Sequence, residues 1–120
     1  MLINELSKRS GVTIHTIRFY EKSGLIKGTR DESITSNNYF HYDEETVEKL
    51  ALIRDAKSIG FTISEISKLM DTWYTNSLDV TAKLDVLDEK LLSIDEKIKQ
   101  LKEMKKRILQ FKKDVIEDNC

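Results

Sequence analysis

The segment from Val80 to Val115 repeats apolar residues every three or four positions, and no glycine or proline interrupts it. This heptad pattern predicts one helix of about 54 Å, at 1.5 Å per residue. The apolar seam consists of Val80, Leu84, Leu87, Leu91, Ile94, Ile98, Leu101 and Ile108. Lysine takes two later seam positions, and Met104 and Phe111 continue the apolar stripe beside them. The rest of the 120-residue chain is too small to cover this helix, so we expect a second chain to cover part of the seam.

The charges along this helix indicate how two copies would pair. Residues 79–96 carry six acidic and two basic side chains, whereas residues 97–113 carry eight basic and one acidic. A parallel pair would set like charges together and would face Lys105 and Lys112 with their own copies. Antiparallel pairing places basic halves over acidic halves, and each exposed pair contributes about 0.3 to 0.5 kcal/mol. We therefore predict an antiparallel dimer; the alternative, a gradient that only complements the helix macrodipole, would act on the terminal turns alone.

Short apolar runs on either side of Gly11 predict a helix, a tight turn and a second helix. Thr13 is suited to cap the second helix, which we expect to end at Ser23 and Gly24. Its exposed face is expected to present groups that bind base edges and phosphates. These are Thr13, His15, Thr16, Arg18, Tyr20 and Lys22, while Ile14, Ile17 and Phe19 are expected to be buried. The net charge of the whole chain, −1, does not indicate a nucleic-acid partner, but residues 1–30 carry +4, from six basic and two acidic side chains, which is a modest local footprint for double-stranded DNA.

Residues 28–42 change to β-branched, aromatic and polar residues around an asparagine-rich turn, which predicts a two-stranded hairpin. A third helix is expected from the acidic residues 43–45 to Gly60, and Thr62 with Glu65 forms a capping-box pattern for a fourth. Two groups of side chains are expected to contact backbone phosphates beside the second helix. They are Arg30, Asn38, Tyr39 and His41 on the hairpin, and Arg54, Lys57 and Thr62 around the Gly60 turn.

These patterns predict a DNA-binding head in residues 1–71, a linker in 72–78, a dimerisation helix in 79–116 and a tail in 117–120. The predicted fold is all-α with a small β-hairpin wing. A winged helix-turn-helix head precedes a long C-terminal antiparallel coiled-coil dimerisation helix. We interpret Trp73 and Tyr74 at the linker as packing residues, and the alternative is a site where a small effector alters the joint.

No motif in the chain indicates an enzyme or a bound cofactor. The sequence lacks a glycine-rich phosphate loop, metalloprotease and serine-hydrolase motifs, and a carboxylate pair suited to acid–base catalysis. The two histidines, His15 and His41, fall on different predicted elements, so no metal site is expected. Cys120 is the single cysteine, which excludes a disulfide within one chain. We expect this thiol to be inert, with a metal ligand shared between chains or a redox role as alternatives.

No run approaches the about 18 apolar residues that a membrane-spanning helix needs. The first residues also carry no basic and apolar secretion signal, so we expect a cytoplasmic protein.

Several ordered motifs of residues 2–70 resemble the MerR family of bacterial transcription regulators. They are Ile3-Asn-Glu-Leu-Ser-Lys-Arg-Ser-Gly-Val12, Thr16-Ile-Arg-Phe-Tyr-Glu21, Gly24-Leu-Ile26, Arg30, Tyr39 with Tyr42, and Gly60-Phe-Thr-Ile-Ser-Glu-Ile66. The long helix after Ser77 is also similar to the antiparallel dimerisation helix of that family. The resemblance implies a homodimer on a palindromic operator within a promoter. It further implies that the dimer bends and untwists an overlong promoter spacer so that RNA polymerase can engage both promoter elements.

By the same resemblance, Arg18 and Tyr20 serve in the recognition helix and Arg30 and Tyr39 in the first wing. Arg54, Lys57 and Thr62 serve in the second wing. The chain departs from the family pattern at Gly28, where proline is usual, and at Phe40, where arginine usually follows the wing tyrosine. Neither cysteine pattern of the metal-sensing and redox-sensing members is present, so the resemblance does not identify a small effector.

Two other functions stay open at the level of sequence. One is an architectural protein that bends DNA without acting at a promoter. The other is a coiled-coil interaction module whose head does not bind DNA.

Overall fold

The computed structural model describes residues 1–30, 40–75 and 79–118. The chain divides into two compact units, Met1–Asp79 and Val80–Cys120. The described elements of the first unit are α1 (Ile3–Ser10), α2 (Ile14–Lys22), β1 (Thr29–Arg30), β2 (Phe40–His41), α3 (Glu44–Ser58) and α4 (Ile63–Thr75), and that of the second is α5 (Val80–Asp118). This mostly helical architecture with a small hairpin confirms the predicted fold class.

The turn between α1 and α2 depends on a glycine. Gly11 has a φ of 73°, in the left-handed region that favours glycine, and its amide donates to the carbonyl of Ser7 over 3.0 Å. The hydroxyl of Ser7 donates to the carbonyl of Val12 over 2.6 Å and so binds the far side of the same turn. Thr13 then caps α2, as predicted, because its Oγ1 accepts the amide of Thr16 over 3.2 Å. The sequence Ser-Lys-Arg-Ser-Gly-Val therefore forms the predicted tight turn.

The predicted hairpin is confirmed at its base. β1 and β2 pair antiparallel, with Thr29 opposite His41 and Arg30 opposite Phe40. The expected phosphate contacts Asn38 and Tyr39 lie outside the described residues.

Local capping also explains where α3 and α4 begin. Asp43 precedes α3 and its Oδ1 accepts both the amide and the hydroxyl of Thr46, each over 3.0 Å. At α4 both bonds of the predicted capping box are present. The amide of Thr62 donates to Glu65 Oε1 over 2.9 Å, and the amide of Glu65 donates to Thr62 Oγ1 over 3.2 Å. The predicted helix starts at residues 43 and 62 are therefore confirmed.

Two helices extend into segments that were expected to be a linker and a tail. The linker was expected at residues 72–78, but α4 continues to Thr75 and includes Trp73 and Tyr74. The polar residues of this segment contain no glycine or proline, and polar side chains alone do not end a helix. Likewise α5 continues to Asp118, so the first two residues of the expected tail are helical. Cys120 lies outside the described residues.

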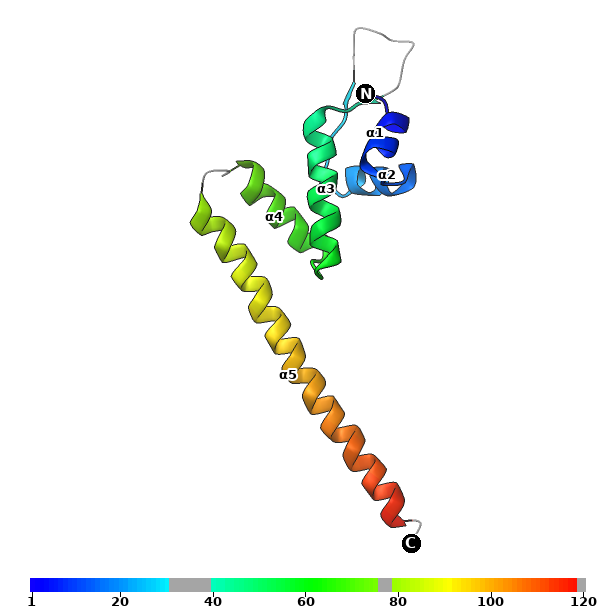
Figure 1. Cartoon of the computed structure of the whole chain (residues 1–120), viewed down its shortest axis with the longest axis vertical. Helices are drawn as coiled ribbons and strands as arrows, with labels where there is room; N and C mark the ends of the chain where they lie inside the picture. The colour runs from blue at the N-terminus through cyan, green and yellow to red at the C-terminus, as the bar shows by residue number, and fades with distance from the viewer. Residues whose placement is uncertain (31–39, 76–78, 119–120) are drawn as a thin grey trace. The chain divides into compact units, whose positions relative to one another are not determined.

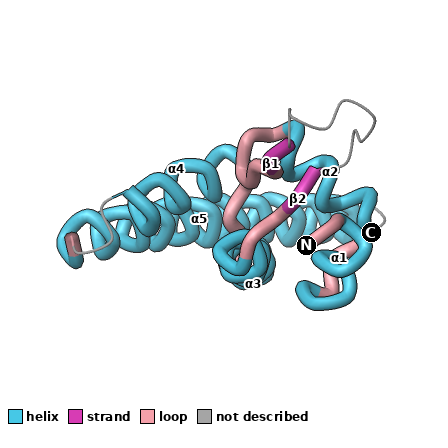
Figure 2. The backbone as a smooth tube through the Cα atoms, turned by 90° about the horizontal axis from the view of Figure 1, so that it is seen from above, coloured by secondary structure: helices cyan, strands magenta, loops and turns pink. Residues whose placement is uncertain are grey.

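The core of the first unit centres on α3. In two perpendicular views α1 and α2 lie on one side of α3 and α4 lies on the other (Figures 1 and 2). The five largest fully buried side chains come from all four helices: Leu6, Ile17, Leu50, Ile53 and Ile66. Burying each of them contributes about 1.5 to 3 kcal/mol to folding. The second unit is one uninterrupted helix of 39 residues, about 58 Å long (Figure 1). Along the described residues, none of the helices combines the length and apolar character needed to cross a bilayer.

Candidate nucleic-acid interface

Helix α2 presents the polar side chains that a recognition helix needs. His15, Arg18 and Lys22 are exposed; His15 and Lys22 lie on the side of α2 opposite the buried Ile17, and Arg18 lies about 100° around the helix from it. Thr13 is exposed and Thr16 is half-buried. The hydroxyl of Thr13 donates to Thr16 Oγ1 over 2.9 Å while its oxygen caps the helix, so the Thr13 hydroxyl is already engaged at the cap. The structure therefore places the long basic side chains, more than the threonines, where they can reach a base edge.

The expected positions of Phe19 and Tyr20 are reversed in the structure. Tyr20, expected on the exposed face, is only 5% exposed, whereas Phe19, expected in the core, is 49% exposed. The reason is the helical period. Tyr20 follows Ile17 by three residues and shares its buried face, whereas Phe19 follows Ile17 by two residues, or about 200° around the helix. The expectation that Tyr20 lies on the exposed face is therefore corrected, and its ring belongs to the core.

The second group of predicted phosphate contacts lies next to the helix-turn-helix. The ammonium of Lys57, at the end of α3, sits 5.9 Å from the centre of the Tyr20 ring. The guanidinium of Arg54 comes within 3.7 Å of the position that a Cβ would take at Gly11. Arg54, Lys57 and Thr62 are all exposed. The structure therefore places Lys57 beside α2 and Arg54 beside the Gly11 turn.

The hairpin pairs an arginine with a phenylalanine ring. The guanidinium of Arg30 lies 5.9 Å from the centre of the Phe40 ring, and both side chains are exposed. Gly28 explains how this packing is possible. A Cβ at residue 28 would lie 2.9 Å from the Cβ of Phe40 and 3.0 Å from the ring of Tyr42. The two departures noted in the sequence, at Gly28 and Phe40, are therefore parts of one packing arrangement.

A part-buried hydrogen bond that could not be expected from the sequence connects the wing to α2. The hydroxyl of Tyr42 donates to Glu21 Oε1 over 2.7 Å, and the Tyr42 side chain is almost fully buried. Burial, together with this bond to a carboxylate, raises the pKa of Tyr42 above its ordinary value. An open cleft of about 620 Å³ lies beside the bond and is lined by Leu2, Ile3, Asn4, Arg18, Glu21, Phe40 and Tyr42. A tyrosine that follows a predicted strand is a weak signal for such a contact, because its partner is 21 residues away.

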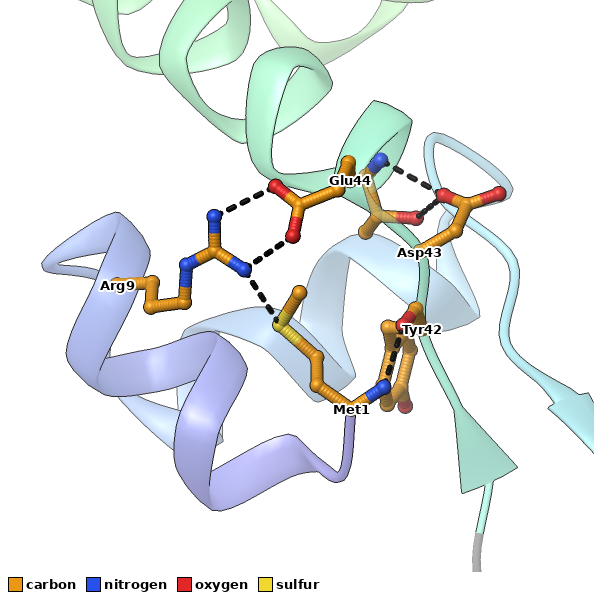
Figure 3. Close-up of polar contacts among 6 residues, drawn as sticks. Met1, Arg9, Tyr42, Asp43 and Glu44 are labelled. Atoms are coloured by element: carbon orange, nitrogen blue, oxygen red, sulfur yellow. Dashed lines mark hydrogen bonds and ion pairs between the residues drawn. The ribbon is translucent and has the colours of Figure 1, made fainter.

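The N-terminal helix is attached to α3 by an ion pair. The Arg9 guanidinium donates to both carboxylate oxygens of Glu44 (Figure 3). This contact raises the pKa of Arg9 and lowers that of Glu44. The ammonium of Met1 donates to the carbonyl of Tyr42 over 2.8 Å, and the amide of Tyr42 donates back to the carbonyl of Met1 over 2.8 Å. These contacts fix α1 against the start of α3 and the end of the wing.

Tyr74 makes a packing contact within the head. The Lys49 ammonium lies 5.0 Å from the centre of its ring, and burial raises the pKa of Tyr74. A cavity of about 200 Å³ adjoins this contact, between the end of α2 and helices α3 and α4. The interpretation of Tyr74 as a packing residue agrees with these contacts.

The helix α5 exposes most of the predicted seam. Val80, Leu84, Leu91, Ile98, Leu101 and Ile108 are exposed, and Leu87 and Ile94 are half-buried. Met104, Phe111 and Val115, which extend the stripe, are also exposed. These side chains form a continuous apolar stripe, whereas apolar residues on ordinary protein surfaces are scattered singly.

Comparison with known proteins agrees with this geometry. Residues 1–73 match the family described as "MerR HTH family regulatory protein", and residues 47–111 match the family described as "MerR, DNA binding". The first match covers the helix-turn-helix, the wing and nearly all of α4. The second covers most of α3, all of α4 and most of α5.

Individual relatives are similar over the same region. The mercuric resistance operon regulatory protein of Bacillus cereus is 40% identical over 68 residues, 57% of this chain and 49% of that protein. The transcriptional regulator CueR of Yersinia pestis is 34% identical over 85 residues, 68% of this chain and 59% of that protein. The chain thus spans about half the length of the curated relatives it matches.

Solved structures extend the similarity along the chain. The lead(II) complex of PbrR691 from Ralstonia metallidurans CH34 matches 92% of this chain and 83% of its own, with 25% identity and a TM-score of 0.77. A second match is the structure of HiNmlR, a MerR family regulator lacking the sensor domain, bound to promoter DNA. It covers 92% of this chain and 85% of that chain, with a TM-score of 0.58. At 20% identity the second match supports the fold alone. Because the family match covers more than half of the chain and agrees with the helix-turn-helix, wing and capping residues, this chain belongs to the MerR family of helix-turn-helix regulatory proteins.

Proposed function

We propose that two copies of this chain bind one operator within a bacterial promoter and regulate its transcription. The observation that carries the proposal is the set of exposed basic side chains on α2, on the wing and at the end of α3. Arg18, Arg30, Arg54 and Lys57 are all exposed there, on elements that the core holds against one another. Arginine and lysine on either side of a recognition helix bind the phosphates that position this helix in the major groove.

The proposed dimer forms through α5. The exposed seam needs a cover, and the acidic first half and basic second half of the helix complement each other in an antiparallel pair. Such a pair fixes the distance between two heads, so that each recognition helix can enter the major groove of one half-site. The dimerisation contacts are the seam residues Val80, Leu84, Leu87, Leu91, Ile94, Ile98, Leu101 and Ile108.

Promoter control follows from a change in DNA shape. Members of the family bend and untwist their promoters, and a stiff helix between two heads is suited to transmit a small rotation to both half-sites. Bending a site of this size costs on the order of 1 to 6 kcal/mol, which is comparable to what phosphate contacts in two wings can supply. RNA polymerase is then the partner that reads the altered spacer.

The names of relatives refer to mercury and lead, but within the described parts of this chain no three histidine, cysteine or acidic side chains gather as metal ligands would. A small molecule or ion that alters the joint between α4 and α5 is the class of effector that this mechanism allows.

The test is a footprint on the DNA upstream of the chain's own gene, followed by a bending assay and by transcription in vitro on the same fragment. We expect protection of a palindrome, a bend centred on it, and a change in transcript level when the protein is added. An Arg18→Ala variant is the matched control, because it removes one predicted base contact and retains the fold. Bending without any change in transcription would favour the architectural function, and no binding to any duplex would favour the interaction module.

A further inference from the structure

An aromatic ring stands exposed among the basic side chains of the recognition helix. Phe19 follows His15 by four residues, so the two share one face of α2. Lys22 and Arg18 lie next to this face, on the side of His15. With 49% of its surface exposed, Phe19 is the large apolar residue of α2 that the core does not cover.

The position of this ring is well defined by its neighbours. It packs against the buried ring of Tyr20 at a centroid distance of 5.9 Å, with the two planes tilted by 53°. The hydroxyl and the amide of Ser23 both donate to the carbonyl of Phe19, over 2.8 and 2.9 Å. The last turn of α2 is therefore capped at this residue, and the ring is presented at a fixed place on the helix.

The major groove offers this ring one kind of matching surface. Phosphate oxygens and the polar base edges require hydrogen-bond donors or acceptors, which phenylalanine lacks and its neighbours supply. The thymine C5-methyl group is the apolar group that a base pair displays in the major groove. Contact between a ring and a methyl group removes apolar surface of both from water.

We infer that Phe19 is a specificity-determining residue that packs against the C5-methyl group of one thymine in each operator half-site. This inference rests on the proposed function, because it requires α2 to lie in the major groove. Phe19 would then help to select the operator. Its contact would add to the hydrogen bonds that Arg18 and His15 are expected to make with the bases.

The experiment removes the methyl group and the ring separately and together. The probe is a fluorescent duplex carrying the footprinted palindrome, in which single thymines are replaced by deoxyuridine, symmetrically in both half-sites. Wild-type dimer is expected to bind one of these duplexes about fourfold more weakly per half-site, the effect of one buried methyl-sized group. Phe19→Ala is expected to bind the thymine duplex more weakly than wild type does. It should also bind the thymine and deoxyuridine duplexes with equal affinity, because the ring that contacts the methyl group is gone. Phe19→Leu should retain part of the sensitivity.

Phe40→Ala provides the matched control, because Phe40 is a similarly exposed ring on the wing. The loss of affinity caused by Phe40→Ala should add to the loss caused by deoxyuridine, because Phe40 lies on the wing and not on α2. Thermal melts of each variant report whether the head still folds. The inference is overturned if wild type binds every deoxyuridine duplex as tightly as the thymine duplex, or if Phe19→Ala keeps the full deoxyuridine effect. A wild-type dimer that protects no palindrome would instead overturn the proposed function, and with it the inference.

Discussion

The hydroxyl of Tyr42 donates a hydrogen bond to Glu21 across 2.7 Å, and this bond joins the end of the wing to the last turn of the recognition helix. The Tyr42 side chain is almost fully buried, and removing its hydroxyl leaves the Glu21 carboxylate without this donor. We expect Tyr42→Phe to lower the free energy of unfolding by about 1.5 to 3 kcal/mol, as for hydrogen bonds to charged groups. Glu21→Gln keeps an acceptor and should lose less. Urea denaturation of both variants measures the difference, and equal losses would contradict a charge-assisted bond.

The same bond has a consequence for DNA binding. If it fixes the angle between wing and recognition helix, Tyr42→Phe should weaken operator binding at a temperature where the variant is still fully folded. We expect a loss of specific affinity with a smaller loss of affinity for random DNA, because phosphate contacts tolerate a reoriented wing better than base contacts do. Titrations against both duplexes measure this ratio. A uniform loss on both duplexes would argue that the bond only stabilises the fold.

Two carboxylates at the start of α3 predict how stability depends on pH. The amide of Thr46 holds the pKa of Asp43 below its ordinary value of 3.8, and the Arg9 guanidinium holds the pKa of Glu44 below its ordinary value of 4.5. Both groups release protons more readily when folded, so their stabilisation is complete above the ordinary values and is lost as the pH falls through the lowered ones. We expect the melting temperature of the wild type to decrease as the pH is lowered below about 4.5. The decrease should be less steep in Glu44→Gln. Arg9→Gln should reproduce that change, because it removes the same ion pair.

Gly28 predicts a steric limit on the wing. Alanine there would place its Cβ 2.9 Å from the Cβ of Phe40, closer than carbon atoms normally approach. We expect Gly28→Ala to destabilise the head by about 1 to 3 kcal/mol, as overpacked substitutions do. The neighbouring exposed Lys27→Ala should change stability by no more than about 0.5 kcal/mol. Thermal unfolding compares the two, and equal effects would show that the wing moves aside at little cost.

Arg18 and Lys57 should affect DNA binding in different ways. If Arg18 contacts a base, Arg18→Ala should lose about 1 to 3 kcal/mol of operator affinity and discriminate less between operator and random DNA. Lys57 is expected to contact a phosphate, so Lys57→Ala should weaken binding to all duplexes alike and lower the salt slope by about 1. Titrations at several salt concentrations separate these effects. A sequence-dependent loss in Lys57→Ala would exchange the two assignments.

The elements that could be predicted from sequence are those that local chemistry determines. Thr13 caps α2, Asp43 caps α3, and Thr62 with Glu65 forms a reciprocal capping box, because each bond joins residues three apart. The Gly11 turn was predictable for the same reason. These short-range signals also account for the correct placement of Arg18, Arg54 and Lys57 on exposed faces.

The features that could not be predicted depend on helical phase or on distant contacts. Phe19 and Tyr20 are adjacent and both aromatic, and the phase set by the buried Ile17 decides between them. The bond between Tyr42 and Glu21 and the close approach at Gly28 join residues far apart in the sequence. The end of α4 at Thr75 carries no glycine or proline signal.

The pairing of two copies through α5 is the claim on which the regulatory account depends. A Cys120→Ser background with a spin label at residue 81, near the start of the helix, measures the distance between the two copies of one position. An antiparallel pair centred between residues 97 and 98 predicts a separation of about 50 Å, at 1.5 Å per residue. A parallel pair would give about 10 Å, the spacing of packed helices. A distance near 50 Å supports the account, whereas a short distance, or a protein that stays monomeric at micromolar concentration, contradicts it.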